Sequence, residues 1–500
     1  MTHTYIQQLF TPPSPVEWIR FVEMSLAILA TIGIGELIRH VFRWPPEFTR
    51  KLVHISVALL VFFAPVLFVS AVPGLILGAA FTVFAYTSIK FGFLKSLHSV
   101  SRGAYGTVYY PVAFLTLIAL FWNSHPQIVS LSMLCLGIGD ASAAIVGESI
   151  TRPMLFHLTS DRKSIQGSLT MFSSSCLALF AGLSYFGGMN VSGGTMASAA
   201  ICASLIATAF EALSSHALDN LTIPLSVGFV LYYTFVPTRM QDVFQFDVGV
   251  ALGIVIAVAA YYARFLKASG SVATFLLASL IYGLGGWKWT VPILTFFVLS
   301  SILSKWGRSR KRSIELISEK TGTRDAGQVA ANGGIAGILM LAQYLFQSLD
   351  FYPLYLAAVA AVTADTWGTE VGTYVRGRTV SIISMKDVSP GMSGGVSLGG
   401  LIGGLVGAAL VAMSATPWID SAQMMLLPIA AGIVASLVDS LLGATVQAQY
   451  RCAICGEWTE RKTHCFTGAE LVQGMRWIDN DVVNWACALS GVIAALVMGG

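Results

Sequence analysis

The chain has 500 residues, of which 55% are hydrophobic and only 11% are charged, and its formal net charge is +4. Soluble domains carry about 25% charged residues, and the mean hydropathy of this chain is +0.73. This composition excludes an ordinary soluble enzyme and predicts an all-α polytopic membrane protein. The N-terminus lacks the basic region, short apolar core and small-residue cleavage site of a signal peptide, so we expect no removable leader.

Apolar runs long enough to cross about 30 Å of hydrocarbon predict about 16 transmembrane helices. They lie near residues 18–42, 52–70, 71–89, 107–122, 127–150, 167–186, 195–213, 221–237, 248–266, 272–286, 289–303, 329–347, 352–375, 396–413, 424–446 and 482–498. We expect two similar halves, residues 1–240 and 241–500. Because each half has the same even number of spans, both would have the same orientation, as in a parallel repeat.

The basic residues predict the orientation of these spans. If the spans alternate in direction, all of the 29 Lys and Arg residues except Arg20, Arg239 and Lys288 fall on one side of the membrane. Loops rich in Lys and Arg stay in the cytoplasm. We therefore expect a protein of the cell membrane whose polar motifs open towards the cytoplasm.

One stretch of the first half combines an acidic residue with a phosphate-binding pattern. Asp140 lies in the apolar run GIGDASAAIVGE, and Lys163, Gly167 and Ser168 follow in RKSIQGS. A carboxylate inside a membrane span is costly and marks a functional site, and Mg²⁺ prefers such oxygen ligands. A lysine, hydroxyl groups and accessible backbone N–H groups suit phosphates. The alternatives are a structural carboxylate paired with a neighbouring helix and an ordinary basic loop.

Further candidates follow on both sides of that stretch. Glu211 is an acidic residue in an apolar run, Asp219 and Asn220 add oxygen ligands in the next loop, and Arg102 is a candidate phosphate clamp. Chance competes with function at Arg102, because it lies in a basic loop. Together these residues extend the predicted site of the first half.

The same order of features recurs in the second half. Asp365 and Asp439 lie in apolar runs, Arg324 precedes them, and Glu211 and Asp439 follow Gly167 and Gly395 at the same distance along the chain. This recurrence suggests two copies of one polar site, with Asp365 as a second Mg²⁺ candidate. The candidate phosphate-binding residues of the second half are Arg324, Asn332, Gly333, Ser393, Gly394, Gly395 and Ser397.

A cysteine- and histidine-rich segment lies near the C-terminus. Cys452 and Cys455 form a CxxC pair, and His464 and Cys465 are adjacent. Four nitrogen and sulfur ligands of this kind are compatible with tetrahedral Zn²⁺. A disulfide is the weaker alternative on the cytoplasmic side. We therefore expect residues 452–465 to be a candidate zinc-binding loop.

These motifs resemble two known families. The first half resembles the phytol kinase and dolichol kinase family through RKLVH at Arg50, GDASAAIVGE at Gly139, RKSIQGS at Arg162 and the acidic pattern from Glu211. The second half resembles the plant phytyl-phosphate kinase family. That resemblance rests on GTRDAGQVAANGG at Gly322, ADTWGTEVG at Ala364, GMSGGVSLGG at Gly391, DSLLGATVQ at Asp439 and the Cys/His pattern.

The resemblance implies a fusion of two successive kinases of prenyl-lipid (tocopherol) metabolism. A prenyl alcohol such as phytol or geranylgeraniol would become the monophosphate and then the diphosphate, with CTP and Mg²⁺. Asp140, Lys163, Glu211, Asp365 and Asp439 would be catalytic. The expected partners are the prenyl alcohol, its monophosphate, a nucleoside triphosphate and the bilayer, with no nucleic acid. A CTP-dependent cytidylyltransferase of a lipid phosphate and a secondary transporter remain alternatives, as does ATP.

Overall fold

The computed structural model describes residues 7–92, 105–187, 191–236, 242–306, 323–375 and 377–499. The fold is mainly helical and divides into two compact units, Met1–Gln241 and Asp242–Gly500. Within the described residues, ten helices are long and apolar enough to cross a membrane, and two further apolar helices are shorter. This is consistent with a polytopic membrane protein. The expected number of about 16 spans and the parallel repeat are not confirmed.

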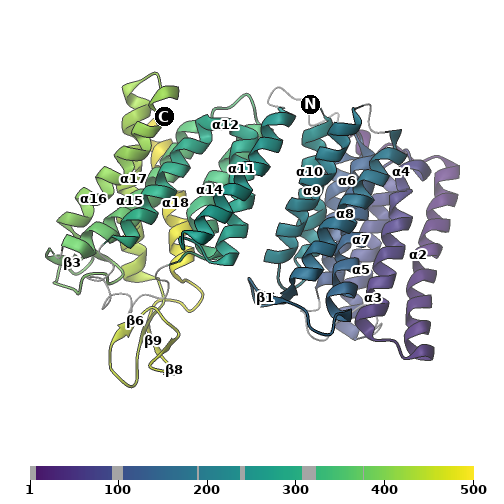
Figure 1. Cartoon of the computed structure of the whole chain (residues 1–500), viewed down its shortest axis with the longest axis horizontal. Helices are drawn as coiled ribbons and strands as arrows, with labels where there is room; N and C mark the ends of the chain where they lie inside the picture. Colours follow the sequence, from purple (N-terminus) through teal and green to yellow (C-terminus); the bar gives the residue numbers. More distant parts are fainter. Residues whose placement is uncertain are drawn as a thin grey trace. The chain divides into compact units, whose positions relative to one another are not determined.

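Unit 1 is a bundle arranged around α7 (Figure 1). Helix α7 packs against α3, α8 and α10. A Cβ on Gly137 would lie 2.1 Å from Ala58 of α3, and one on Gly139 would lie 2.2 Å from Ser175 of α8. Glycine therefore allows these helices to approach closely. The described elements are α2 (Pro15–Phe42), α3 (Pro46–Phe62), α4 (Ala64–Leu67), α5 (Val72–Phe91), α6 (Gly106–Phe121), α7 (Pro126–Ser149), β1 (Leu155–His157), β2 (Arg162–Ser164), α8 (Ile165–Tyr185), α9 (Gly193–Leu213) and α10 (Asp219–Phe235).

Unit 2 is arranged around α15, which packs against α12, α14, α16, α17 and α18. Gly404 of α16, Gly432 of α17 and Gly491 of α18 each lie against a backbone carbonyl of α15. A Cβ at these positions would lie 2.8, 3.0 and 3.0 Å from those oxygen atoms. The elements are α11 (Val243–Tyr262), α12 (Ala268–Lys305), α14 (Ala326–Leu345), α15 (Tyr352–Val375), β3 (Thr379–Ser381), β4 (Gly395–Ser397), α16 (Leu398–Ser414), η2 (Thr416–Trp418), α17 (Ala422–Thr445), β5 (Gln449–Arg451), β6 (Trp458–Thr459), β7 (Thr463–His464), β8 (Thr467–Gly468), β9 (Glu470–Gln473) and α18 (Asn480–Gly499).

Helix α12 reverses its direction at Gly286, whose φ of 58° and ψ of −153° are not helical. A straight helix would separate its ends by about 55 Å. Instead, the ring of Phe297 lies 6.3 Å from that of Phe265, just before the helix begins. The residues before and after Gly286 are therefore two antiparallel helices, in the places where the sequence predicts separate spans at 272–286 and 289–303.

The reversal of α12 is held by two tyrosines of α15. The hydroxyl of Tyr352 donates to the carbonyl oxygen of Lys288 at 3.0 Å, and that of Tyr355 donates to the carbonyl oxygen of Trp289. Pro292 has no N–H to donate to the carbonyl oxygen of Lys288, four residues earlier. A carbonyl group without a helical partner needs another partner inside a membrane, and the hydroxyl of Tyr352 supplies it.

Each unit contains a short antiparallel hairpin that leads into a serine-capped helix. Strands β1 and β2 pair before α8, where the N–H of Gly167 donates to Ser164 Oγ at 3.1 Å. Strands β3 and β4 pair before α16, where the N–H of Gly400 donates to Ser397 Oγ at 3.1 Å. Gly167 thus corresponds locally to Gly400, not to Gly395, with which the sequence pattern aligned it.

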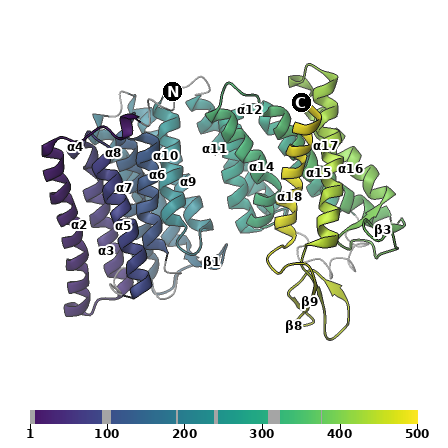
Figure 2. The ribbon, with the colours of Figure 1, turned by 180° about the vertical axis from the view of Figure 1, so that it is seen from behind.

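The C-terminal strands β5–β9 form a small structure of their own at one end of unit 2 (Figures 1 and 2). Strand β3 lies at the same end of the unit. Strand β5 pairs with both β6 and β9, and β7 pairs with β8. All of these pairings are antiparallel. This small structure contains the Cys/His segment and lies beside the hairpin that leads into α16.

Candidate functional site

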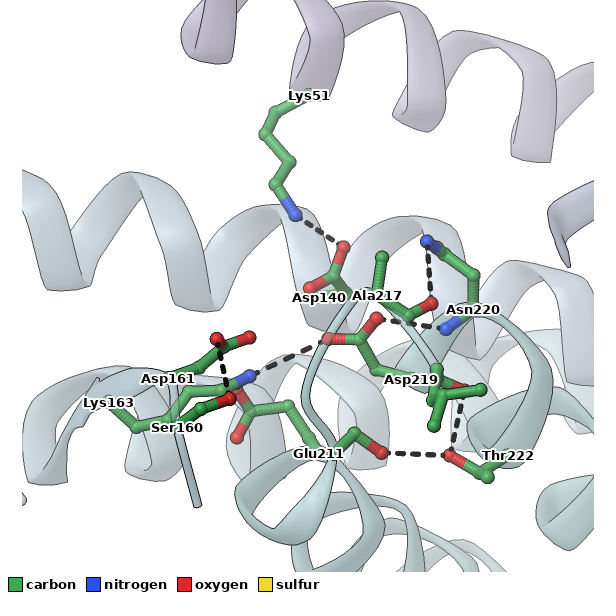
Figure 3. Close-up of polar contacts among 12 residues, drawn as sticks. Lys51, Asp140, Ser160, Asp161, Lys163, Glu211, Ala217, Asp219, Asn220 and Thr222 are labelled. Atoms are coloured by element: carbon green, nitrogen blue, oxygen red, sulfur yellow. Dashed lines mark hydrogen bonds and ion pairs between the residues drawn. The ribbon is translucent and has the colours of Figure 1, made fainter. Parts of the chain in front are cut away.

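The first polar cluster, in unit 1, begins with a buried ion pair between two helices. Lys51 of α3 contacts Asp140 of α7 (Figure 3), and the two residues are only 2% and 7% exposed. One carboxylate oxygen of Asp140 is thereby engaged by an ammonium group. This arrangement is the one expected for a carboxylate paired with a neighbouring helix, and the Mg²⁺ role of Asp140 stays a prediction. Lys51 was not among the predicted site residues.

Lys163 of β2 joins two further carboxylates of unit 1. Its Nζ lies 2.5 Å from Glu211 Oε1 and 3.5 Å from Asp219 Oδ2 (Figure 3). Burial opposes the charge on Lys163, but the two carboxylates outweigh burial and raise its pKa. Lys163 is therefore a stable cation at neutral pH. The structure brings together three residues that the sequence pattern placed in one site.

Several buried polar atoms of this cluster have no hydrogen-bond partner among the described residues. They are Glu211 Oε2, Asn220 Oδ1 and Ser168 Oγ. Buried polar groups are normally paired, so these atoms suit a ligand or water. Gly167 differs, because its N–H is engaged by Ser164 and a Cβ there would lie 3.1 Å from the carbonyl of Ala143. Its backbone therefore serves helix packing. Arg102 lies outside the described residues.

Unit 2 contains a cavity of about 350 Å³ that opens among α12, α14, α15, α16 and α17. Most of the predicted residues of the second half line it: Arg324, Asn332, Asp365, Ser393, Gly394, Gly395, Ser397 and Asp439. Gly333 does not, because a Cβ there would lie 2.3 Å from Leu277. Gly333 is therefore a helix-packing residue, and its expected phosphate-binding role is not supported.

The cavity of unit 2 combines carboxylates with a half-buried arginine, Arg324. Asp365 and Asp439 interact with each other, and Asp439 Oδ2 has no hydrogen-bond partner in the described parts of the chain. Arg324 donates to Ser301 Oγ at 3.2 Å. Burial lowers the pKa of Arg324, and the charge of Glu370 opposes that effect. A cavity lined by both carboxylates and a cationic side chain suits a bound cation together with an anionic group.

Sequence reasoning did not place Glu460 and Gln447 in this site. Both line the cavity, and Glu460 Oε1 accepts hydrogen bonds from Ser393 Oγ and from Gln447 Nε2 at 3.1 Å. Glu460 lies in a polar, cysteine-containing loop, where an acidic residue carries no signal. Asn480 and Asn484 also line the cavity. Their spacing of one helical turn was the available signal for a shared face.

The predicted zinc ligands gather at one point of the C-terminal strands. Within the described residues, Cys452, Cys455, His464 and Cys465 each offer a ligand atom, and these atoms lie within 4.8 Å of one another. We call them the Cys/His cluster. Backbone N–H groups of Cys455 and Ile454 point at the sulfur of Cys452, and these hydrogen bonds, together with the His464 side chain, lower the pKa of Cys452 to about 6. The cysteines are free thiols.

Comparison with known proteins places the chain among integral membrane proteins. Residues 251–492 match the family model of the integral membrane protein DUF92. A phytol kinase of Synechocystis is 31% identical over 216 residues, which are 91% of that protein and 43% of this chain. Protein PGR of Arabidopsis thaliana is 27% identical over 272 residues, 93% of that protein and 49% of this chain.

A third relative is an uncharacterized membrane protein of Methanocaldococcus jannaschii, 25% identical over 84% of its length and 41% of this chain. No solved structure matches the chain. Each of these relatives aligns with less than half of the chain, so the comparisons do not show a fusion of two halves. The high coverage of the Synechocystis protein at 31% identity nevertheless decides the family: the chain is a multi-pass membrane protein that belongs to the phytol kinase family.

Proposed function

We propose that the chain is a membrane kinase that phosphorylates a prenyl alcohol in unit 1 and the resulting monophosphate in unit 2. The main support is similarity to a protein named phytol kinase. The observation that carries the division of labour is that each unit has its own polar site beside a serine-capped helix. Phosphoryl transfer needs mainly positioning and charge neutralisation, and both sites provide cationic and acidic groups for it.

In unit 1, the phosphates of the nucleotide would bind at the start of α8. Lys163 lies directly before the capping Ser164, beside the positive end of the helix dipole, and a phosphate would compete with Glu211 and Asp219 for its ammonium group. The buried hydroxyl of Ser168, which lacks a partner among the described residues, offers a hydrogen bond. Glu211 and Asn220, each with a buried oxygen lacking such a partner, would hold Mg²⁺ together with Asp140.

In unit 2, the acceptor already carries a phosphate, and the cavity supplies a half-buried cation, Arg324, for it. Asp365 and Asp439 would hold Mg²⁺, and Asp439 Oδ2, which has no hydrogen-bond partner among the residues that the structure describes, supports this assignment. A bound Mg²⁺ would neutralise charge on the non-bridging phosphate oxygens. CTP as the donor rests on the family resemblance. We further propose that both sites face the cytoplasm, because most basic residues fall on that side.

The proposal is tested with the purified full-length protein, Mg²⁺, γ-labelled CTP or ATP, and either phytol or phytyl monophosphate. We expect Lys163→Met to slow monophosphate formation at least ~100-fold while conversion of supplied monophosphate continues. We expect Asp439→Asn to slow conversion of the monophosphate to the diphosphate, while formation of the monophosphate continues. Lys90→Met, which changes an exposed lysine, is the control and should leave both steps unchanged.

Three results would contradict the proposal in different ways. Absence of label in any prenyl lipid with either nucleotide would reject a kinase and favour transport. Release of pyrophosphate, with the nucleotide retained on the lipid, would indicate a cytidylyltransferase. Loss of both steps in both variants, with both proteins folded, would reject the assignment of one step to each unit.

A further inference from the structure

The spacing of the Cys/His cluster fits a tetrahedral metal ion. Zinc bonds of about 2.3 Å to sulfur and about 2.0–2.1 Å to nitrogen require ligand atoms about 3.5–3.8 Å apart. His464 Nδ1 lies 3.4 Å from Cys455 Sγ and 3.4 Å from Cys465 Sγ, and all four ligand atoms fall within 4.8 Å of one another. The side chains are therefore arranged for a metal ion before one is added.

Two backbone turns bring these side chains together. In the first turn, the N–H of Gly456 donates to the carbonyl oxygen of Cys452 at 2.9 Å. In the second, Cys465 and Phe466 connect β7 with β8 and have φ values of 49° and 61°. Such left-handed hairpin turns favour Asn and Gly, and other residues adopt them at a cost in free energy. Metal coordination at Cys465 gives a physical reason for this unfavourable conformation.

The segment from Gln449 to Gln473 has little hydrophobic core of its own. Tyr450 and Cys452 are buried, but Ile454, Phe466 and Val472 are exposed. Polypeptides with so small a core depend on disulfides or metal ions for stable folding. The cysteines of this segment form no disulfide. A bound metal ion is therefore the stabilising group that its side chains can hold.

We propose that the Cys/His cluster is a structural zinc site that orders residues 449–473 and thereby presents Glu460 to the cavity of unit 2. Four protein ligands complete a tetrahedral site and leave no open position for catalysis. Glu460 lies between the ligands Cys455 and His464 in the sequence. A metal ion that binds both ligands fixes both ends of the segment that carries Glu460.

The contacts of Glu460 explain why its position matters to the cavity. Its carboxylate accepts hydrogen bonds from Ser393, in the hairpin before α16, and from Gln447, at the end of α17. All three residues line the cavity. Zinc therefore acts on the site at a distance, through a positioning residue, and this inference does not depend on which reaction the cavity performs.

The test measures zinc in the full-length protein purified without chelators. We expect about one zinc ion per chain, and at least about a tenfold loss of zinc in Cys455→Ser and in Cys465→Ser. Cys176→Ser, a cysteine of α8 outside the cluster, is the matched control and should keep its zinc. Glu460→Gln should also keep zinc, because its carboxylate is not a ligand.

A second measurement covers variants that fail to fold. Trypsin cleavage after Arg461 or Lys462 reports the order of the loop in the wild-type protein. A strong zinc chelator should accelerate this cleavage at least about tenfold, and added zinc should restore protection. Exchange of the metal for Co²⁺ should give the intense absorption of thiolate-bound tetrahedral cobalt.

Several outcomes would overturn the proposal. They are a zinc content below about 0.1 per chain, stoichiometric zinc that persists in both cysteine variants, and a disulfide between Cys452 and Cys455 found by mass spectrometry. A loop that trypsin cleaves equally fast with and without chelator would also refute the ordering role. None of these results would bear on whether the protein phosphorylates a prenyl alcohol, so the two proposals fail separately.

Discussion

Replacing Asp140 by asparagine leaves the ammonium group of Lys51 buried without a counter-charge. The reverse change, Lys51→Met, removes the only cation that contacts the Asp140 carboxylate within the described residues. Both residues are almost inaccessible, at 2% and 7% exposure. Neither charge can be rescued by solvent without opening the contact between α3 and α7. Each single substitution should therefore destabilise unit 1 strongly.

The size of the effect follows from the geometry. Two unit charges about 2.8 Å apart attract each other by about 6 kcal/mol at an effective dielectric constant of about 20. Part of this energy only offsets the cost of burial. Removal of one partner of a buried pair typically costs about 3–5 kcal/mol. Removal of both charges in Lys51→Met/Asp140→Asn should cost less than about 2 kcal/mol, because no charge then remains buried.

The assay is the apparent unfolding temperature of the purified protein in one detergent at one scan rate, since membrane proteins often unfold irreversibly. Each single variant should unfold about 6–20 °C below wild type, at about 2–4 °C per kcal/mol. The unfolding temperature of the double variant should be close to that of wild type. The control Lys90→Met should unfold at the wild-type temperature. If the loss of stability in the double variant instead equals the sum of the losses in the two single variants to within about 0.5 kcal/mol, the two charges do not interact and the ion pair does not stabilise the fold.

Two further predictions concern glycines of unit 2. Gly404→Val would place a Cβ 2.8 Å from the carbonyl oxygen of Ala364 and should destabilise unit 2 by about 1–3 kcal/mol. The control is Gly377→Ala, whose Cβ would have no atom within 4 Å. It should leave the unfolding temperature unchanged in the same thermal assay. In Gly286→Ala, the alanine must adopt φ 58° and ψ −153°, which should lower the free energy of unfolding by about 1–3 kcal/mol. Its control is Gly33→Ala, whose Cβ would have no atom within 4 Å and which should leave stability unchanged. If a variant and its control unfold at the same temperature, the argument for that glycine is wrong.

The helices could be placed from the sequence because their signal is local. An apolar run of sufficient length marks a span, and the reversal of α12 was visible as two runs on either side of Gly286. The polar residues of the cavity were also accessible, because Asp365 and Asp439 stand out in apolar runs. A charged residue inside an apolar run can be recognised from the sequence alone.

Other parts of the sites could not be predicted because their signal depends on tertiary contacts. Lys51 lies far from Asp140 in the sequence and follows another basic residue, so it looks like part of a cytoplasmic loop. Glu460 is one charge in a polar loop until the fold brings it to Ser393. The alignment of Gly167 with Gly395 failed because similar spacing does not identify a helix cap, whereas the hydrogen bond to Ser164 does.

The reversal at Gly286 has a consequence for biosynthesis. The two helices of α12 are joined without a hydrophilic loop, and Lys288 is the only charged residue near the turn. A ribosome-bound chain therefore offers no polar segment whose translocation could separate two insertion steps. We expect both helices to leave the translocon together as a hairpin. Correct membrane integration then depends on the folding of this pair during synthesis, before the tyrosines of α15 have emerged to hold the turn.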